Sequence, residues 1–135
     1  MTRDLLMVPM SPGELLDRMT ILDLKTQRIG DPAALKFCEL ELRLLKSAWH
    51  KSKYSGVPIQ NELDELLLVN AALWDVEDRL RRFEHEQDFG GGFIAAARSV
   101  YRWNDRRAAI KHAINHRLGS PLAEVKSYQS AAPPS

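Results

Sequence analysis

Residues 11–32 read SPGELLDRMTILDLKTQRIGDP, and this stretch contains one complete helix with its start and its end. Ser11 stands three residues before Glu14 with a proline between them, which is the capping-box pattern of a helix N-terminus. Apolar residues then recur at helical spacing until Gly30, a typical residue after a helix end. Asp31 followed by a proline is again the pattern of a helix N-terminus, a capping residue before a proline in the first turn. The stretch therefore predicts one helix that ends just before Gly30 and a second that begins after Asp31.

Glycine and proline divide the rest of the chain in the same way. The stretch 52–58 contains Gly56 and Pro58 and predicts a loop, and three consecutive glycines at 90–92 predict a second break. No alternation of apolar and polar residues is long enough for a sheet. We therefore expect an all-α protein, an antiparallel four-helix bundle with helices over about 12–28, 32–51, 60–86 and 93–118.

Both ends of the chain fall outside these helices. Leu5 to Pro9 is apolar and ends in proline, which favours an N-terminal extended arm. Ser120 and the proline after it can cap a short C-terminal helix to about Lys126, and residues 129–135 have the composition of a frayed, flexible tail. We expect a single helical-bundle domain over residues 1–128.

Length and charge exclude several classes of protein. The 135 residues suit one domain, and 19 Lys and Arg almost balance 18 Asp and Glu, so the net charge of +1 argues against a nucleic-acid partner. No segment approaches the roughly 18 apolar residues of a membrane span, and the N-terminus is a poor secretory signal. One cysteine excludes an internal disulfide and fits a cytoplasmic location. With four scattered histidines we expect no metal and no cofactor.

The predicted second helix has two apolar faces. Its first stripe consists of Leu35, Cys38, Leu42, Leu45 and Trp49, and its second of Phe37, Leu40, Leu44 and Ala48. A helix in an isolated bundle needs only one such stripe. On the first helix, Ile21 and Leu24 also lie away from the main stripe of Leu15, Met19, Leu22 and Ile29. The arm at Leu5–Val8 can cover part of this surplus and a second copy the rest, so we expect a homo-oligomer, with a dimer as the commonest form.

Polar residues interrupt the apolar stripes of the third and fourth helices. Asn70 and Glu77 lie within the stripe of the third helix, and Asn104, Arg107 and Lys111 within that of the fourth. An ionised side chain in a dry core costs several kcal/mol unless it is paired. These side chains must therefore either satisfy one another or border a wet cavity.

The two alternatives imply different functions. One is a salt-bridge network that fixes the register of the helices. The other is a polar pocket between the third and fourth helices, in which Arg107 and Lys111, four residues apart, grip one carboxylate or phosphate and Glu77 serves as a general base. The candidate ligand-binding residues are Glu77, Asp78, Asn104, Asp105, Arg107 and Lys111. The pattern leaves open whether the protein is an enzyme.

Three segments resemble the signatures of a known family. Residues 11–29, residues 73–79 (LWDVEDR) and residues 97–111 (ARSVYRWNDRRAAIK) are similar to a family of small bacterial proteins with a domain of unknown function. The resemblance covers most of residues 5–128 and implies an all-helical cytoplasmic protein. It supplies no catalytic residue. The first signature also contains Asp17, Arg18 and Lys25.

Taken together, these features favour a homo-oligomeric assembly or interaction module whose partner is a second copy of itself. The alternative is a binding protein or enzyme that acts on an anionic metabolite, phosphorylated or carboxylated, in the polar pocket.

Overall fold

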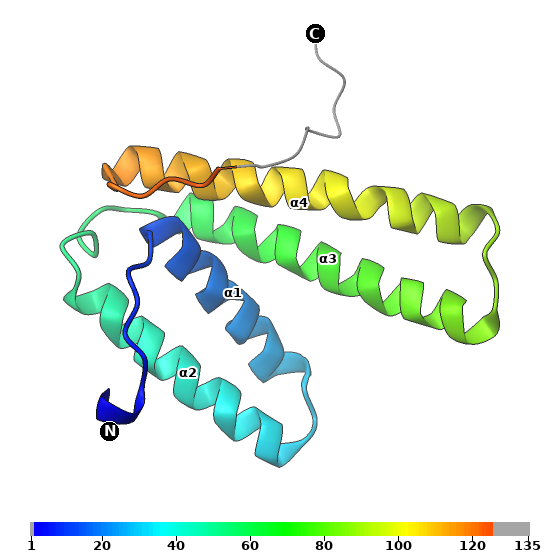
Figure 1. Ribbon diagram of the computed structural model, residues 1–135, viewed down its shortest axis with the longest axis horizontal. Coiled ribbons are helices and arrows are strands. Elements are labelled where there is room, and N and C mark those ends of the chain that lie inside the picture. The colour runs from blue at the N-terminus through cyan, green and yellow to red at the C-terminus, as the bar shows by residue number, and fades with distance from the viewer. Residues whose placement is uncertain (1, 126–135) are drawn as a thin grey trace, which may run out of the picture.

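The computed structural model describes residues 2–125, which form four α-helices and one short turn (Figure 1). The helices are α1 (Pro12–Arg28), α2 (Pro32–Lys51), α3 (Gln60–Glu86) and α4 (Gly91–Leu118), preceded by the 3-10 turn η1 (Thr2–Asp4). No strand occurs within residues 2–125. The all-α prediction is confirmed.

Local capping accounts for the helix bounds. The Ser11 hydroxyl accepts the amide of Glu14 at 3.2 Å at the start of α1, and a carboxylate oxygen of Asp31 accepts the amide of Ala34 at 3.3 Å at the start of α2. After α4, Gly119 adopts the left-handed conformation with φ 68°, which suits a residue without a side chain. The start of α4 differs from the prediction by two residues, because the last two glycines of the break are already helical.

Helix α1 lies at the centre of the molecule. It packs against α2, α3 and α4, whereas α2 packs against no helix other than α1. Figure 1 shows two hairpins, α1–α2 and the longer α3–α4, and the loop end of the α3–α4 hairpin extends well beyond α1. Arg117 of α4 and Glu62 of α3 form an ion pair near the opposite end of that hairpin. The four helices thus pack together as predicted, but three of them depend on α1.

The core is formed where α1 meets the other helices. Leu16 of α1 and Leu66 of α3 are fully buried, and each such side chain contributes roughly 1.5–3 kcal/mol of burial energy. The predicted stripe of α1 missed Leu16, because a helix with neighbours on several sides buries more than one face. The buried cluster consists of Leu16, Trp49, Ile59, Leu66, Val69, Ile110 and Ile114.

The chain ends agree with the predictions in part. Residues 6–10 have no regular structure, as expected of an extended arm. Leu6 is 94% exposed and Met7 80%, so these two side chains cover little apolar surface, whereas Leu5 is 44% exposed. Residues 120–125 contain no helix, contrary to the predicted short one, and the Ser120 hydroxyl is bonded to Leu122. The expected helix end near Lys126, the domain boundary at 128 and the tail over 129–135 lie outside the described residues.

Among residues 2–125, no helix combines the length and the apolar character that crossing a membrane requires.

Candidate functional site

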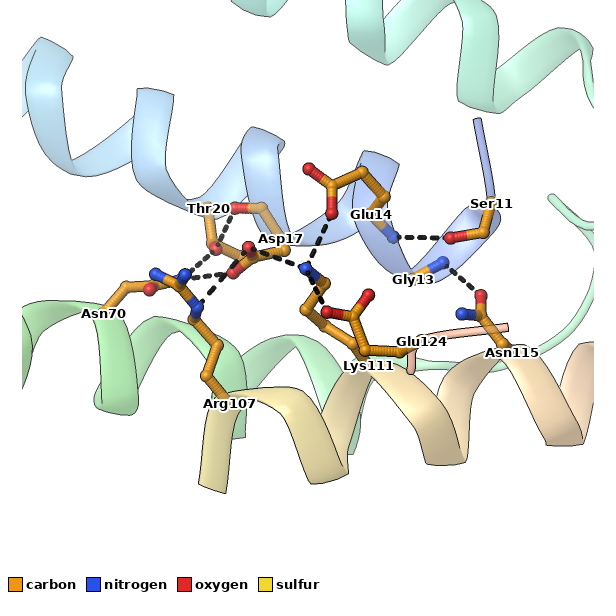
Figure 2. A network of polar contacts seen from close by, with 10 residues as sticks. All are labelled: Ser11, Gly13, Glu14, Asp17, Thr20, Asn70, Arg107, Lys111, Asn115 and Glu124. Carbon is orange, nitrogen blue, oxygen red and sulfur yellow. Dashed lines mark hydrogen bonds and ion pairs between the residues drawn. The ribbon is translucent and has the colours of Figure 1, made fainter. Parts of the chain in front are cut away.

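The Lys111 side chain is the centre of a buried ion cluster between α1 and α4. Its side chain is 7% exposed. The Lys111 Nζ lies 2.6 Å from Glu14 Oε2, 3.2 Å from Glu124 Oε1 and 3.8 Å from Asp17 Oδ2 (Figure 2). An ammonium group has three donors and no acceptor. Glu14 and Glu124 lie within hydrogen-bond distance of it, and Asp17 adds a charge at 3.8 Å.

Asp17 of α1 connects this cluster to α3. Its Oδ2 lies 3.8 Å from Arg107 Nε and 3.8 Å from Lys111 Nζ, and its Oδ1 accepts from Asn70 Nδ2 at 2.9 Å. Asn70 also donates to the Thr20 hydroxyl at 2.9 Å, which in turn donates to the Asp17 carbonyl at 2.7 Å. The Asp17 carboxylate, whose side chain is 4% exposed, is thereby compensated by groups from α3 and α4.

A close helix contact lies beside the cluster. The amide of Gly13 donates to Asn115 Oδ1 at 2.7 Å. A Cβ added at Gly13 would lie 2.6 Å from the carbonyl oxygen of Lys111. Only glycine therefore allows α1 and α4 to approach this closely. The Asn115 Nδ2 is buried without a hydrogen-bond partner in the described part of the chain.

The surrounding carboxylates set the charge of Lys111. Burial alone lowers the pKa of Lys111, but the hydrogen bond and the charge of Glu14, with Asp17 and Glu124, act in the opposite direction. The net effect raises the pKa of Lys111 above its ordinary value of 10.5. The side chain is therefore charged at physiological pH and cannot serve there as a neutral nucleophile or a general base.

Glu77 does not belong to this cluster. It is exposed on α3, and no ion pair within residues 2–125 joins it to Arg107 or Lys111. From α1, Glu14 and Asp17 provide counter-ions to Lys111, and Asp17 also provides one to Arg107. Of the two alternatives, Lys111 and Arg107 fit the internal network, whereas Glu77 borders a cavity.

Sequence reasoning missed three partners of Lys111. Glu14 was assigned to the capping box, and Ser11 does cap α1, but the Glu14 carboxylate contacts Lys111. Asp17 follows Glu14 by three residues on the same face of α1, and this acidic pair on a buried face was the available signal. Glu124 comes from the segment after α4, and its sequence neighbourhood gave no signal.

An open groove of about 350 Å³ lies between α1 and α3 and ends at α4. This volume is within the range of roughly 300–1,000 Å³ typical of small-molecule sites. Apolar side chains form most of its walls, and charged ones its rim. The lining residues are Ile21, Leu24, Asn70, Leu73, Trp74, Glu77, Asp78, Arg81 and Arg107.

A smaller polar cavity of about 190 Å³ is lined by three of the predicted site residues. Asn104, Arg107 and Lys111 line it together with Glu124. Arg107 therefore borders both cavities. Asp105 is half-buried, has an interaction partner and lines neither cavity. The structure thus distributes five of the six predicted residues over two cavities instead of one pocket.

The chain belongs to a family of unknown function, DUF6165, which matches residues 6–135. This confirms the resemblance of the three signature segments. No curated protein and no solved structure shows a significant match. The family assignment therefore brings no activity with it, and function must be argued from the geometry.

Proposed function

We propose that the protein is a self-association module in which two copies pair through the outer face of α2. The observation that carries this proposal is the isolation of that face. Helix α2 packs against α1 alone, and Phe37 on its opposite side is 76% exposed. We call this side the outer stripe, consisting of Phe37, Leu40, Leu44 and Ala48.

The spacing within the outer stripe suits another helix. Phe37, Leu40 and Leu44 follow one another at intervals of three and four residues, which is the a/d pattern of a coiled-coil seam. Leu40 and Leu44 are only half-buried in the single chain. A helix laid along this stripe would cover all three side chains, and a twofold contact between identical copies is the commonest way to provide one.

The charges beside the outer stripe favour one orientation. Lys36 and Arg43 flank one edge, and Glu41 flanks the other. In a parallel pair, Lys36 of each copy faces Glu41 of the other, whereas in an antiparallel pair the basic edges face each other. Glu41 also contacts Arg18 at 3.3 Å, but this exposed pair is weak and does not prevent a second contact. We therefore propose a parallel pair.

Two further features support self-association. The arm adds exposed apolar side chains, with Leu6 94% and Val8 64% exposed, and contiguous apolar surface of this kind marks interaction sites. The net charge of +1 produces little repulsion between copies.

The Lys111 cluster offers less support for the alternative of an anionic metabolite. Glu14, Asp17 and Glu124 already surround the ammonium. Three carboxylates thus balance the charge of the Lys111 ammonium, so an additional anion at Lys111 would enter a region of negative charge.

The orientation can be tested by exchanging the flanking charges and measuring the dimer dissociation constant by sedimentation equilibrium. Lys36→Glu should weaken a parallel dimer roughly two- to thirtyfold, because two symmetric pairs of about 0.2–1 kcal/mol each are lost. The double variant Lys36→Glu with Glu41→Lys should restore the affinity of the parallel dimer. In an antiparallel dimer, Lys36→Glu would instead tighten association by facing Arg43, and that result would contradict the proposal.

A further inference from the structure

We infer that the groove between α1 and α3 is a binding site for a small organic monoanion with an apolar body. The groove lies away from the outer stripe of α2, so this inference does not depend on self-association. It rests on the walls of the groove, on its inner end and on its rim.

The walls provide an apolar slot that is in place before a ligand arrives. Ile21 and Leu24 of α1 line one side, and Leu73 and Trp74 of α3 the other. Arg28 holds the indole of Trp74, because its guanidinium lies 5.5 Å from the ring centroid. Arg28 is itself fixed by an ion pair of 2.8 Å. A rigid aromatic wall of this kind binds a flat or branched apolar group at little entropic cost.

The inner end of the groove provides a cationic fork. Arg107 is 32% exposed on its side chain and meets Asp17 through Nε at a loose 3.8 Å. Arg107 lines the groove, and the ion pair to Asp17 through Nε does not use its two Nη groups. A guanidinium edge of this kind binds a carboxylate or sulfonate with two parallel hydrogen bonds. Beside it, Asn70 is held by Asp17 and Thr20, so the polar end is rigid (Figure 2).

The rim of the groove limits the charge of the ligand. Glu77 and Asp78 are exposed there, about two turns along α3 from Asn70. A second negative group projecting outward would face both carboxylates, with Arg81 as the cation on the same part of the rim. The groove should therefore prefer a monoanion to a dianion of the same shape.

This site also explains the polar interruptions in the stripe of α3. Asn70 and Glu77 share a face with Leu73 and Trp74, and beyond Arg28 no part of α1 covers that face. Glu77 is therefore exposed on a groove wall, whereas Asn70, buried and hydrogen-bonded to α1, lies at the inner end of the groove.

The test uses naphthalenesulfonate as the probe and naphthalenedisulfonate as a dianionic control of similar shape. Binding is followed through the indole N–H signal of Trp74 in two-dimensional NMR. The signal is assigned with Trp74→Phe. We expect the monosulfonate to shift it saturably and the disulfonate to bind several-fold more weakly. Arg107→Gln should weaken the monosulfonate at least about tenfold, while Arg106→Gln, an exposed neighbour stacked on Trp103, should not.

A second variant changes an exposed residue, so a loss of folding does not account for its effect on binding. Glu77→Gln changes an exposed residue and should bring the affinity for the disulfonate closer to that for the monosulfonate, whereas Glu84→Gln, farther along α3, should have no effect. Equal affinity of both probes in the wild type, a Trp74 signal that does not move, or equal losses in Arg107→Gln and Arg106→Gln would each overturn the inference.

Discussion

At the scale of single residues, the interior of this protein depends on one ammonium group that three carboxylates share. Lys111 contacts Glu14, Asp17 and Glu124, and Asp17 in turn holds Arg107 and Asn70. Removal of the cation takes the counter-ion from Glu14 and Glu124 and leaves the buried Asp17 carboxylate with only Arg107 and Asn70 among the contacts of this cluster. Such losses are among the most destabilising that single substitutions produce.

Lys111→Met should therefore cost about 3–5 kcal/mol of unfolding free energy at neutral pH. Urea denaturation measures the loss, and Lys46→Met on the exposed side of α2 is the matched control, with little expected change. A Lys111→Met protein as stable as this control would show that the cluster does not hold the fold together.

The stability difference between the wild type and Lys111→Met has a predictable pH dependence. The folded pKa of Lys111 is raised above its ordinary value of 10.5, which approximates the unfolded chain. The stability that the charge provides is therefore complete below about pH 10.5 and is lost as pH rises through the raised folded pKa. The difference in unfolding free energy between wild type and Lys111→Met should stay constant through neutral pH. It should become smaller only in strongly alkaline solution. A difference that becomes smaller near neutrality contradicts this assignment.

Gly13 makes a second prediction at the residue scale. A Cβ at this position would meet the Lys111 carbonyl at 2.6 Å, and a backbone atom cannot move aside as a side chain can. Gly13→Ala should cost about 1–3 kcal/mol. Gly30→Ala is the control, because nothing lies within 4 Å of the added methyl, and it should be neutral or slightly stabilising. Thermal unfolding compares the two, and equal melting temperatures would argue against a tight contact.

At the scale of helices, the bounds could be predicted and the neighbours could not. Caps and breaks act within a few residues, so Asp31 before α2 and Gly119 after α4 set those ends locally. The partner of a buried side chain depends on which helix lies opposite. The sequence placed Lys111 on a buried face correctly, but not against α1, because the central position of α1 is a property of the assembled fold. Glu77 lines the groove together with Arg107 and lies outside the Lys111 cluster, and the sequence left both placements open.

At the scale of the whole molecule, the architecture leaves two surfaces without partners. Helix α1 holds α2 on one side and the α3–α4 hairpin on the other, so the outer stripe of α2 and the groove between α1 and α3 both stay open. The ion cluster fixes α1 to α4 between them. This separation allows one surface to bind a second copy while the other binds a small molecule.

The molar mass in solution, measured by light scattering on the eluting protein at micromolar concentrations, tests the central claim most directly. The wild type should have about twice the chain mass of 15.4 kDa. Phe37→Glu should reduce it to the mass of one chain, and Ile94→Glu, a 52% exposed residue on α4, should leave the dimer intact. A wild type that remains a monomer over this range, or a Phe37→Glu variant that is as dimeric as the wild type, would contradict pairing through α2.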